Sequence, residues 1–151
     1  MEVVAVERLP GPHGLRCGLS DEWRTAIEQA GLTHATMEEI ARWSPTWITT
    51  RDPDDLARCG YHQEVDWRKI ADLACRAFDE AIAKFGPEGD ATHLPRRRFL
   101  RGLRPQEKLY LGSLFADPIC WLPTTGYLTN GQRRSCALRA AGAPYVPVEV
   151  R

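Results

Sequence analysis

The segment YLTNGQRRSCALRAAGAPYVPVEV, residues 127–150, is the most informative part of this 151-residue chain. Aromatic and β-branched residues at 127–129 predict a strand, which runs into the turn-forming pair Asn130-Gly131. Residues 132–141 are rich in Ala, Arg and Leu, and this composition favours a helix. The valines at 146–150 predict a last strand. The segment therefore predicts a strand–turn–helix–strand unit.

The turn of this unit has the features of a phosphate-binding site. Gly131 permits a sharp turn and a close approach of a ligand. The first N–H groups of the helix lack partners within it, and together with the helix dipole they attract anions. Two arginines add guanidinium groups that suit phosphate oxygens. The alternative to a phosphate site is an ordinary glycine turn before a helix, with arginines that are only solvated. The residues expected to bind phosphate or nucleotide are Thr129, Asn130, Gly131, Gln132, Arg133 and Arg134.

The same segment resembles the ParB/sulfiredoxin-like superfamily. The residues that carry the resemblance are Gly131-Gln132-Arg133-Arg134, Ala137, Ala141-Gly142 and Val146-Pro147-Val148. In the chromosome-partition members the turn reads Gly-Glu-Arg-Arg and binds the phosphates of CTP. In sulfiredoxin it reads Gly-Cys-His-Arg, with a catalytic cysteine and ATP as co-substrate. The order of elements expected over 105–122 fits the family as well, whereas residues 1–95 show no resemblance.

Departures from the family pattern narrow the expected function. Gln132 stands where sulfiredoxin has its cysteine, and Cys136 lies one helical turn further on, so we do not expect sulfiredoxin chemistry. The chain has no Glu-Asn-x-x-Arg motif and ends at Arg151, so we do not expect a DNA-clamping partition protein. The resemblance then implies a stand-alone member of the fold.

The leading expectation is a protein that binds a nucleotide or another phosphorylated ligand at Asn130–Arg134. The cofactor implied by the resemblance is a nucleoside triphosphate, CTP or ATP, with Mg²⁺. Nucleotide hydrolysis, phosphoryl transfer and nuclease activity stay open, with no catalytic residue assigned. Acids that could help to hold Mg²⁺ in the last third of the chain are Glu107, Asp117 and Glu149. The alternative is a non-enzymatic nucleic-acid-binding or regulatory protein that uses the same basic surface.

Around this unit, the pattern of apolar residues predicts a single domain of α/β or α+β class. Apolar residues at spacings of three and four predict a helix from Trp67 to Phe85, capped by Asp66 and ended by Gly86-Pro87. A strand is expected within Met1–Leu9. Further helices are expected from Ser20 to Gly31, from Met37 to Trp43 and from Pro105 to Phe115, and a strand at Ile119–Leu122. A mostly helical region 1–95 would thus pack on a small mixed sheet formed by 96–151.

Charge is unevenly divided although the chain is neutral overall. Residues 1–95 hold 17 acids and 10 bases, and residues 96–151 hold 3 acids and 10 bases. We therefore expect any anion to bind in the last third. The stretch Arg96–Arg104 contains five arginines and Phe99. It is either a solvated face or a nucleic-acid patch, and Arg98 and Arg101 are candidates for secondary anion contacts.

Cysteine and hydropathy patterns bear on metals and on compartment. The pairs His13/Cys17 and Cys59/His62 have spacings that zinc accepts and form a weak metal candidate, with packing as the alternative. Five dispersed cysteines favour a reducing compartment over a disulfide framework. No long apolar run or signal peptide is evident, so we expect a cytoplasmic protein without a membrane partner.

Overall fold

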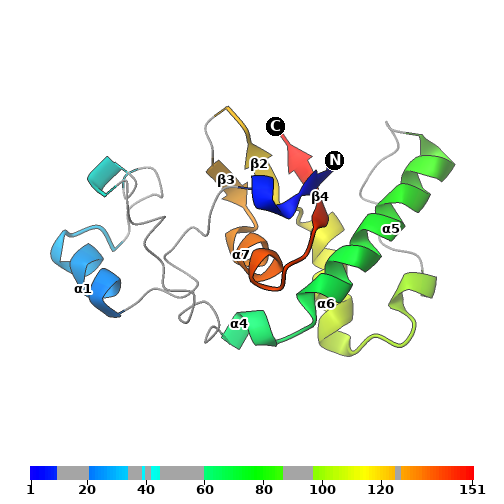
Figure 1. The fold of residues 1–151 in the computed structure, drawn as a ribbon, viewed down its shortest axis with the longest axis horizontal. Coiled ribbons are helices and arrows are strands. Elements are labelled where there is room, and N and C mark those ends of the chain that lie inside the picture. The colour runs from blue at the N-terminus through cyan, green and yellow to red at the C-terminus, as the bar shows by residue number, and fades with distance from the viewer. Residues whose placement is uncertain (10–20, 34–38, 40–41, 45–59, 87–96, 125–126) are drawn as a thin grey trace.

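The computed structural model describes residues 1–9, 21–33, 39, 42–44, 60–86, 97–124 and 127–151. It confirms the α+β class, with helices packed on a four-stranded mixed sheet (Figure 1). The helix expected from Met37 to Trp43 lies largely outside the described residues. The helices are α1 (Asp21–Gln29), α4 (Gly60–Gln63), α5 (Trp67–Phe85), α6 (Pro105–Ala116) and α7 (Gln132–Ala140), with 3₁₀ turns η1 (Val6–Arg8) and η3 (Arg97–Leu100).

The sheet has the order β1-β4-β2-β3. Its strands are β1 (Glu2–Ala5), β2 (Cys120–Leu122), β3 (Tyr127–Asn130) and β4 (Tyr145–Val150). β1 pairs antiparallel with β4, and β2 pairs antiparallel with β3. β2 and β4 run parallel, so the chain crosses from one to the other through β3 and α7. The first and the last strands of the chain are thereby neighbours.

The strand expected within Met1–Leu9 is shorter than that range. It ends at Ala5, and the chain then turns through η1. The guanidinium of Arg139 on α7 stabilises this turn, since its Nη2 donates to the carbonyls of Val6 (3.4 Å), Glu7 (3.3 Å) and Leu9. Arg139, which lies 130 residues after Leu9 in the sequence, thus stabilises the turn at which β1 ends.

Helix α5 spans the residues that the sequence predicts. Asp66 Oδ1 accepts a hydrogen bond from the Lys69 N–H at 3.0 Å, and Gly86 ends the helix at φ 80°. Its apolar face is buried and packs against β4 and α6. The buried residues of this face are Trp67, Ile70, Ala71, Ala74, Ala77 and Phe78.

One hydrophobic core contains residues of both regions that the charge pattern distinguishes, 1–95 and 96–151. It runs from Val4 on β1 through Trp67 on α5 to Leu111 on α6, Leu138 on α7 and Val148 on β4. In Figure 1, α1 lies away from the sheet, and its buried Ile27 is not part of this core. No helix within the described ranges is long and apolar enough to cross a membrane.

Candidate functional site

The turn between β3 and α7 presents backbone donors that have no hydrogen-bond partner among the residues that the structure describes. Gly131 adopts the left-handed conformation at φ 80° and forms the N-cap, and the first helical hydrogen bond runs from Ser135 N to the Gly131 carbonyl at 2.8 Å. The N–H groups of residues 132–134 precede the first donor of that ladder, and glycine has no side chain to cap them. The turn is therefore able to attract an anion through backbone N–H groups and the helix dipole.

Packing also explains why this position is a glycine. A Cβ added at Gly131 would lie 2.7 Å from Cγ1 and 2.9 Å from Cα of Ile119, which is completely buried at the start of β2. The space beside the glycine is therefore filled by protein rather than open to a ligand. Close contact with Ile119 and the positive φ both require glycine here, whether or not a ligand binds.

Arg134 is occupied by the protein itself. Its side chain is only 7% exposed. Nη1 donates to the Ser113 carbonyl at 2.7 Å and to the Asp117 carbonyl, and Nη2 donates to Asp117 Oδ2 at 3.0 Å. These acceptors lie at the C-terminal end of α6, where the helix dipole favours a positive charge, and the Ser113 carbonyl also accepts from Asp117 N at 3.1 Å. Arg134 therefore clamps α7 to α6, and it would have to give up these bonds to reach a phosphate.

Two further residues of the expected site brace the same turn. Asn130 Nδ2 donates to Asp117 Oδ1 at 2.6 Å and to the Pro118 carbonyl at 2.9 Å. Gln132 Nε2 donates back to the Leu128 carbonyl at 2.9 Å. These bonds make the start of α7 rigid. Thr129 is exposed on β3.

Arg133 is the arginine of the turn that faces solvent. Its guanidinium carbon lies 5.9 Å from the ring centre of Tyr61 on α4, a cation–π contact. It makes no ion pair to any other residue that the structure describes. Adjacent positions on a helix point about 100° apart, which is why the two neighbouring arginines differ so strongly.

Tyr61 belongs to an aromatic cluster that was not identified from the sequence. Its ring centre lies 5.2 Å from that of Trp67 and 5.4 Å from that of Tyr110, and Trp67 Nε1 donates to the Tyr61 carbonyl at 3.1 Å. The Tyr110 hydroxyl donates to Glu64. Burial, followed by this hydrogen bond, raises the pKa of Tyr110. Tyr61 is thus held firmly beneath Arg133.

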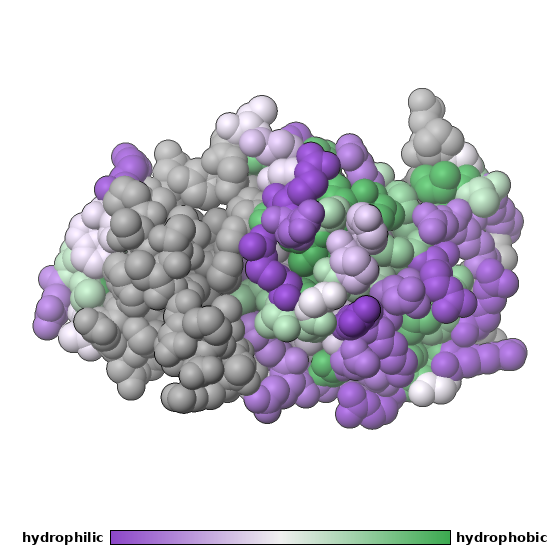
Figure 2. Space-filling model, in the orientation of Figure 1, coloured by the Kyte–Doolittle hydropathy of each residue, from purple (hydrophilic) through white to green (hydrophobic). Residues whose placement is uncertain are grey.

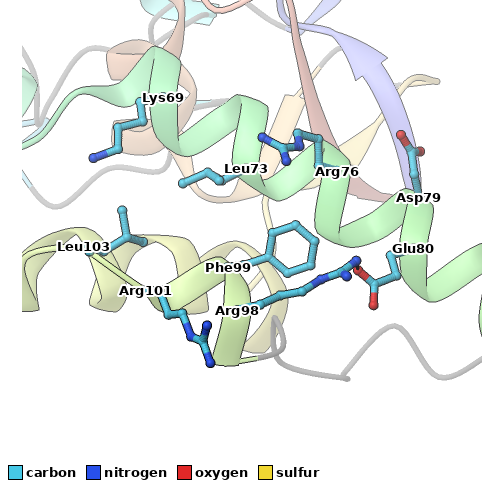
Figure 3. Close-up of a pocket in the computed structure, with 10 residues that line it drawn as sticks. Lys69, Leu73, Arg76, Asp79, Glu80, Arg98, Phe99, Arg101 and Leu103 are labelled. Carbon is cyan, nitrogen blue, oxygen red and sulfur yellow. Dashed lines mark hydrogen bonds and ion pairs between the residues drawn. The ribbon is translucent and has the colours of Figure 1, made fainter.

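Arg98 and Arg101, the candidates for secondary anion contacts, lie in another part of the surface from the β3–α7 turn. They line a groove of about 640 Å³ between α5 and residues 98–103, and no residue of α7 lines it (Figure 3). Arg98 reaches across to Glu80 on α5, whereas Arg101 points away from α5. The segment is held there because Phe99 and Leu103 are buried, at 8% and 7% exposure. The Arg98 guanidinium carbon lies 5.1 Å from the Phe99 ring centre, and the buried ring has little surface left on which a nucleic-acid base could stack.

The acids that could hold Mg²⁺ differ in their burial and in the hydrogen bonds that they already accept. Asp117 contacts the turn, and its side chain is 69% exposed. Glu107 is buried and accepts from Arg104 N at 2.7 Å and from Lys69 Nζ at 3.0 Å. Glu149 accepts from the Cys120 thiol at 3.2 Å and from Arg151. Asp117 is therefore the acid of residues 96–151 that is placed to share a metal with a ligand at the turn.

The zinc candidate falls mainly on residues that the structure does not describe. His13, Cys17 and Cys59 lie outside the described ranges. His62 lies on α4, and neither of its ring nitrogens has a hydrogen-bond partner or contact with solvent. Within the described part of the chain, no three His, Cys, Asp or Glu side chains are close enough to hold a metal ion. The zinc site stays a prediction.

Comparison of the chain with protein-family models, with curated proteins and with solved structures found no match. The resemblance to the ParB/sulfiredoxin-like superfamily, drawn from residues 127–150 and from the order of elements before them, therefore stays a prediction.

Proposed function

We propose that the turn between β3 and α7 binds the phosphate group of a nucleotide or of another phosphorylated ligand. The observation that carries the proposal is the combination of uncapped N–H groups after Gly131 with the solvent-exposed guanidinium of Arg133 beside them. Backbone N–H groups at a helix start and an arginine fork together bind phosphate oxygens well. Arg134, Asn130 and Gln132 support the turn from behind.

Tyr61 acts as a positioning residue in this proposal. Its ring centre lies 5.9 Å from the guanidinium carbon of Arg133, and this contact would restrict the side chain before a ligand binds. Trp67 and Tyr110 hold the ring in place. A side chain held in advance loses less conformational entropy when the ligand binds.

A nucleoside triphosphate with Mg²⁺ is the ligand class that we propose first. Asp117 supplies carboxylate oxygens, which Mg²⁺ prefers, at the side of the turn where Asn130 ends β3. Its oxygens already accept from Asn130 and Arg134, which would orient the carboxylate towards a metal. A metal bound there would neutralise phosphate charge in hydrolysis or phosphoryl transfer. Simple binding without chemistry needs only the N–H groups and Arg133.

The experiment is a thermal-shift and calorimetric screen against CTP, ATP, GTP and UTP, with and without Mg²⁺. Arg133→Glu is the informative variant, because an acid in the first turn favours the helix but repels phosphate. Arg101→Glu is the matched control, since it makes the same charge change on the far groove. Stabilisation of the wild type and of the control, but not of Arg133→Glu, is the result expected.

A short DNA duplex and single strand in the same screen address the nucleic-acid alternative. Binding to a nucleic-acid backbone weakens steeply with salt and is distributed over many arginines. Equal loss of DNA binding in Arg133→Glu and Arg101→Glu, with no response to any nucleotide, would replace the proposed function by that alternative.

A further inference from the structure

The aromatic cluster beside Arg133 carries an exposed carboxylate that is only partly engaged. Glu64 directly follows α4, and its Oε2 accepts from the Tyr110 hydroxyl and from Gln106 Nε2, the latter at 3.0 Å. Among the residues that the structure describes, no group donates to Oε1 of Glu64. Two donors thus hold the carboxylate in place, and its second oxygen is free to accept a hydrogen bond from a ligand.

One face of α6 connects this carboxylate with the phosphate-binding turn. The residues of this face are separated by four, three and four positions, which places them on the same side of the helix; they are Gln106, Tyr110, Ser113 and, at the C-cap, Asp117. At one end, Asp117 Oδ1 accepts from Asn130 of the turn. At the other end, Gln106 and Tyr110 donate to Glu64. The seven positions from Tyr110 to Asp117 correspond to about 10 Å along the helix axis.

Two tyrosine rings lie between Arg133 and Glu64. The guanidinium carbon of Arg133 lies 5.9 Å from the ring centre of Tyr61, and this ring centre lies 5.4 Å from that of Tyr110. Both tyrosines are half-buried, so part of each side chain reaches the surface. Figure 2 shows hydrophilic surface over α4, the helix that carries Tyr61 and precedes Glu64. From the start of α7 outward, the order is therefore cation, aromatic rings and hydrogen-bond acceptor.

This order matches the parts of a nucleotide. A base stacks on aromatic side chains, and a carboxylate accepts from the amino group of a base or from a sugar hydroxyl. A second phosphate group is a poor occupant of the far end, because the negative charge of Glu64 repels it. The carboxylate thus orients the ligand, with its phosphates at the turn and its neutral donor at Glu64.

We propose that the ligand of the β3–α7 turn is a nucleotide whose nucleoside part lies along Tyr61 and Tyr110 and donates a hydrogen bond to Glu64 Oε1. This inference rests on the proposed function and deepens it, since the turn alone accepts any phosphorylated ligand. The donor belongs to the base or to the sugar, and the two sources are separated by the choice of nucleotide.

The experiment is a calorimetric titration, with Mg²⁺, of inorganic tripolyphosphate and of nucleoside triphosphates. CTP is compared with UTP, and ATP with inosine triphosphate, because the second member of each pair lacks the amino group of the base. The 2′-deoxy forms of CTP and ATP test the sugar hydroxyl. Tripolyphosphate reports on the turn without any nucleoside.

Glu64→Ala is the informative variant, and Glu28→Ala, the same change at an exposed position of α1, is the matched control. We expect CTP or ATP to bind Glu64→Ala about tenfold more weakly than the wild type, with tripolyphosphate unchanged and Glu28→Ala like the wild type. Glu64→Gln keeps an oxygen that accepts from Tyr110 and Gln106, so it should fold normally and bind with intermediate affinity. The preference for the amino base, or for the 2′-hydroxyl, should disappear in Glu64→Ala.

The outcomes separate this inference from the phosphate site on which it rests. Tripolyphosphate that binds as tightly as every nucleotide, nucleotide binding that Glu64→Ala leaves unchanged, or equal loss of tripolyphosphate and nucleotide in Glu64→Ala would each overturn the inference. The phosphate site would still stand if Arg133→Glu abolished the binding of tripolyphosphate. Absence of any binding to the wild type would overturn both.

Discussion

Arg134 Nη2 lies 3.0 Å from Oδ2 of Asp117, and this contact joins the first turn of α7 to the residue that ends α6. The arginine side chain is 7% exposed and the aspartate side chain 69% exposed. The same guanidinium also binds the carbonyls of Ser113 and Asp117. Arg134, the second arginine of the turn, is therefore a structural clamp, whereas the first, Arg133, is exposed to solvent.

Replacing Arg134 should cost stability, whereas replacing Arg133 should not. Arg134→Ala removes the hydrogen bonds to the carbonyls of Ser113 and Asp117 and to the Asp117 carboxylate, and we expect the free energy of unfolding to fall by about 2–3 kcal/mol. Arg133→Ala should change it by less than about 0.5 kcal/mol, as is usual for surface positions. Urea denaturation followed by circular dichroism measures both. Equal stability of the two variants would show that the clamp contributes nothing.

Two glycines at the ends of α7 allow conformational strain to be separated from steric contact. Gly142 has φ +64° and nothing within 4 Å of an added Cβ, so Gly142→Ala should cost about 1 kcal/mol from the left-handed backbone alone. At Gly131, φ is +80° and an added Cβ would also meet Ile119 at 2.7 Å. Gly131→Ala should therefore cost at least about 1 kcal/mol more, because a packed core yields little. Similar urea midpoints for the two variants would show that the turn moves away from Ile119 freely.

Cys75 should react slowly with thiol reagents near neutral pH. Burial, followed by the charges of Asp79 and Asp72, raises the pKa of Cys75 from 9.0 to about 11. At pH 8 its thiolate fraction should be about 100-fold below that of an unshifted thiol, since the thiolate is the reactive form. Because the folded state holds the proton more tightly, this group's contribution to stability is complete below pH 9 and is lost as pH rises towards 11.

The measurement for Cys75 is the rate of reaction with a disulfide reagent, in a variant whose other four cysteines are replaced by alanine. Asp79→Asn in that background should raise the rate at pH 8. A rate equal to that of free cysteine, unaffected by Asp79→Asn, would contradict the placement of Cys75 beside these acids.

Glu107 should contribute to acid unfolding. Its hydrogen bonds with the Arg104 N–H and with Lys69 lower its pKa below the usual 4.5. A carboxyl group whose pKa is lowered by folding contributes its full stabilisation at pH values above its ordinary pKa. This stabilisation is lost as the pH falls through the lowered pKa of the folded state. We expect Glu107→Gln to flatten the fall of the urea midpoint below pH 4.5, whereas Glu28→Gln, at an exposed position of α1, should leave it unchanged. If the urea midpoints of the wild type and of both variants fell in parallel as the pH was lowered, the predicted role of Glu107 would be contradicted.

Local elements of the fold were predictable because their signals are local. Asp66 and Gly86 mark the ends of α5 by capping chemistry, and the helix begins and ends where they indicate. The strand Tyr145–Val150 and the helix that starts at Gln132 follow from residue preferences and from the glycine between strand and helix. Such signals act over a few residues and do not depend on how the elements pack.

Features that depend on distant partners were not predictable in the same way. Nothing in the pair Arg133-Arg134 tells which guanidinium will be buried, since that depends on where α6 ends against α7. Tyr61 lies beneath Arg133 although the two are 72 positions apart in the sequence. In the sequence the stretch Arg96–Arg104 resembles a continuous basic surface, yet within it the buried Phe99 and Leu103 pack residues 98–103 against α5.

The most direct test of the proposed phosphate site is the calorimetric titration of Mg²⁺–CTP and Mg²⁺–ATP into the wild type, Arg133→Glu and Arg101→Glu. We predict saturable binding to the wild type and to Arg101→Glu, and loss of binding in Arg133→Glu with an unchanged or slightly higher melting temperature. Undiminished binding to Arg133→Glu, or loss of binding only in Arg101→Glu, would contradict a phosphate site at the start of α7.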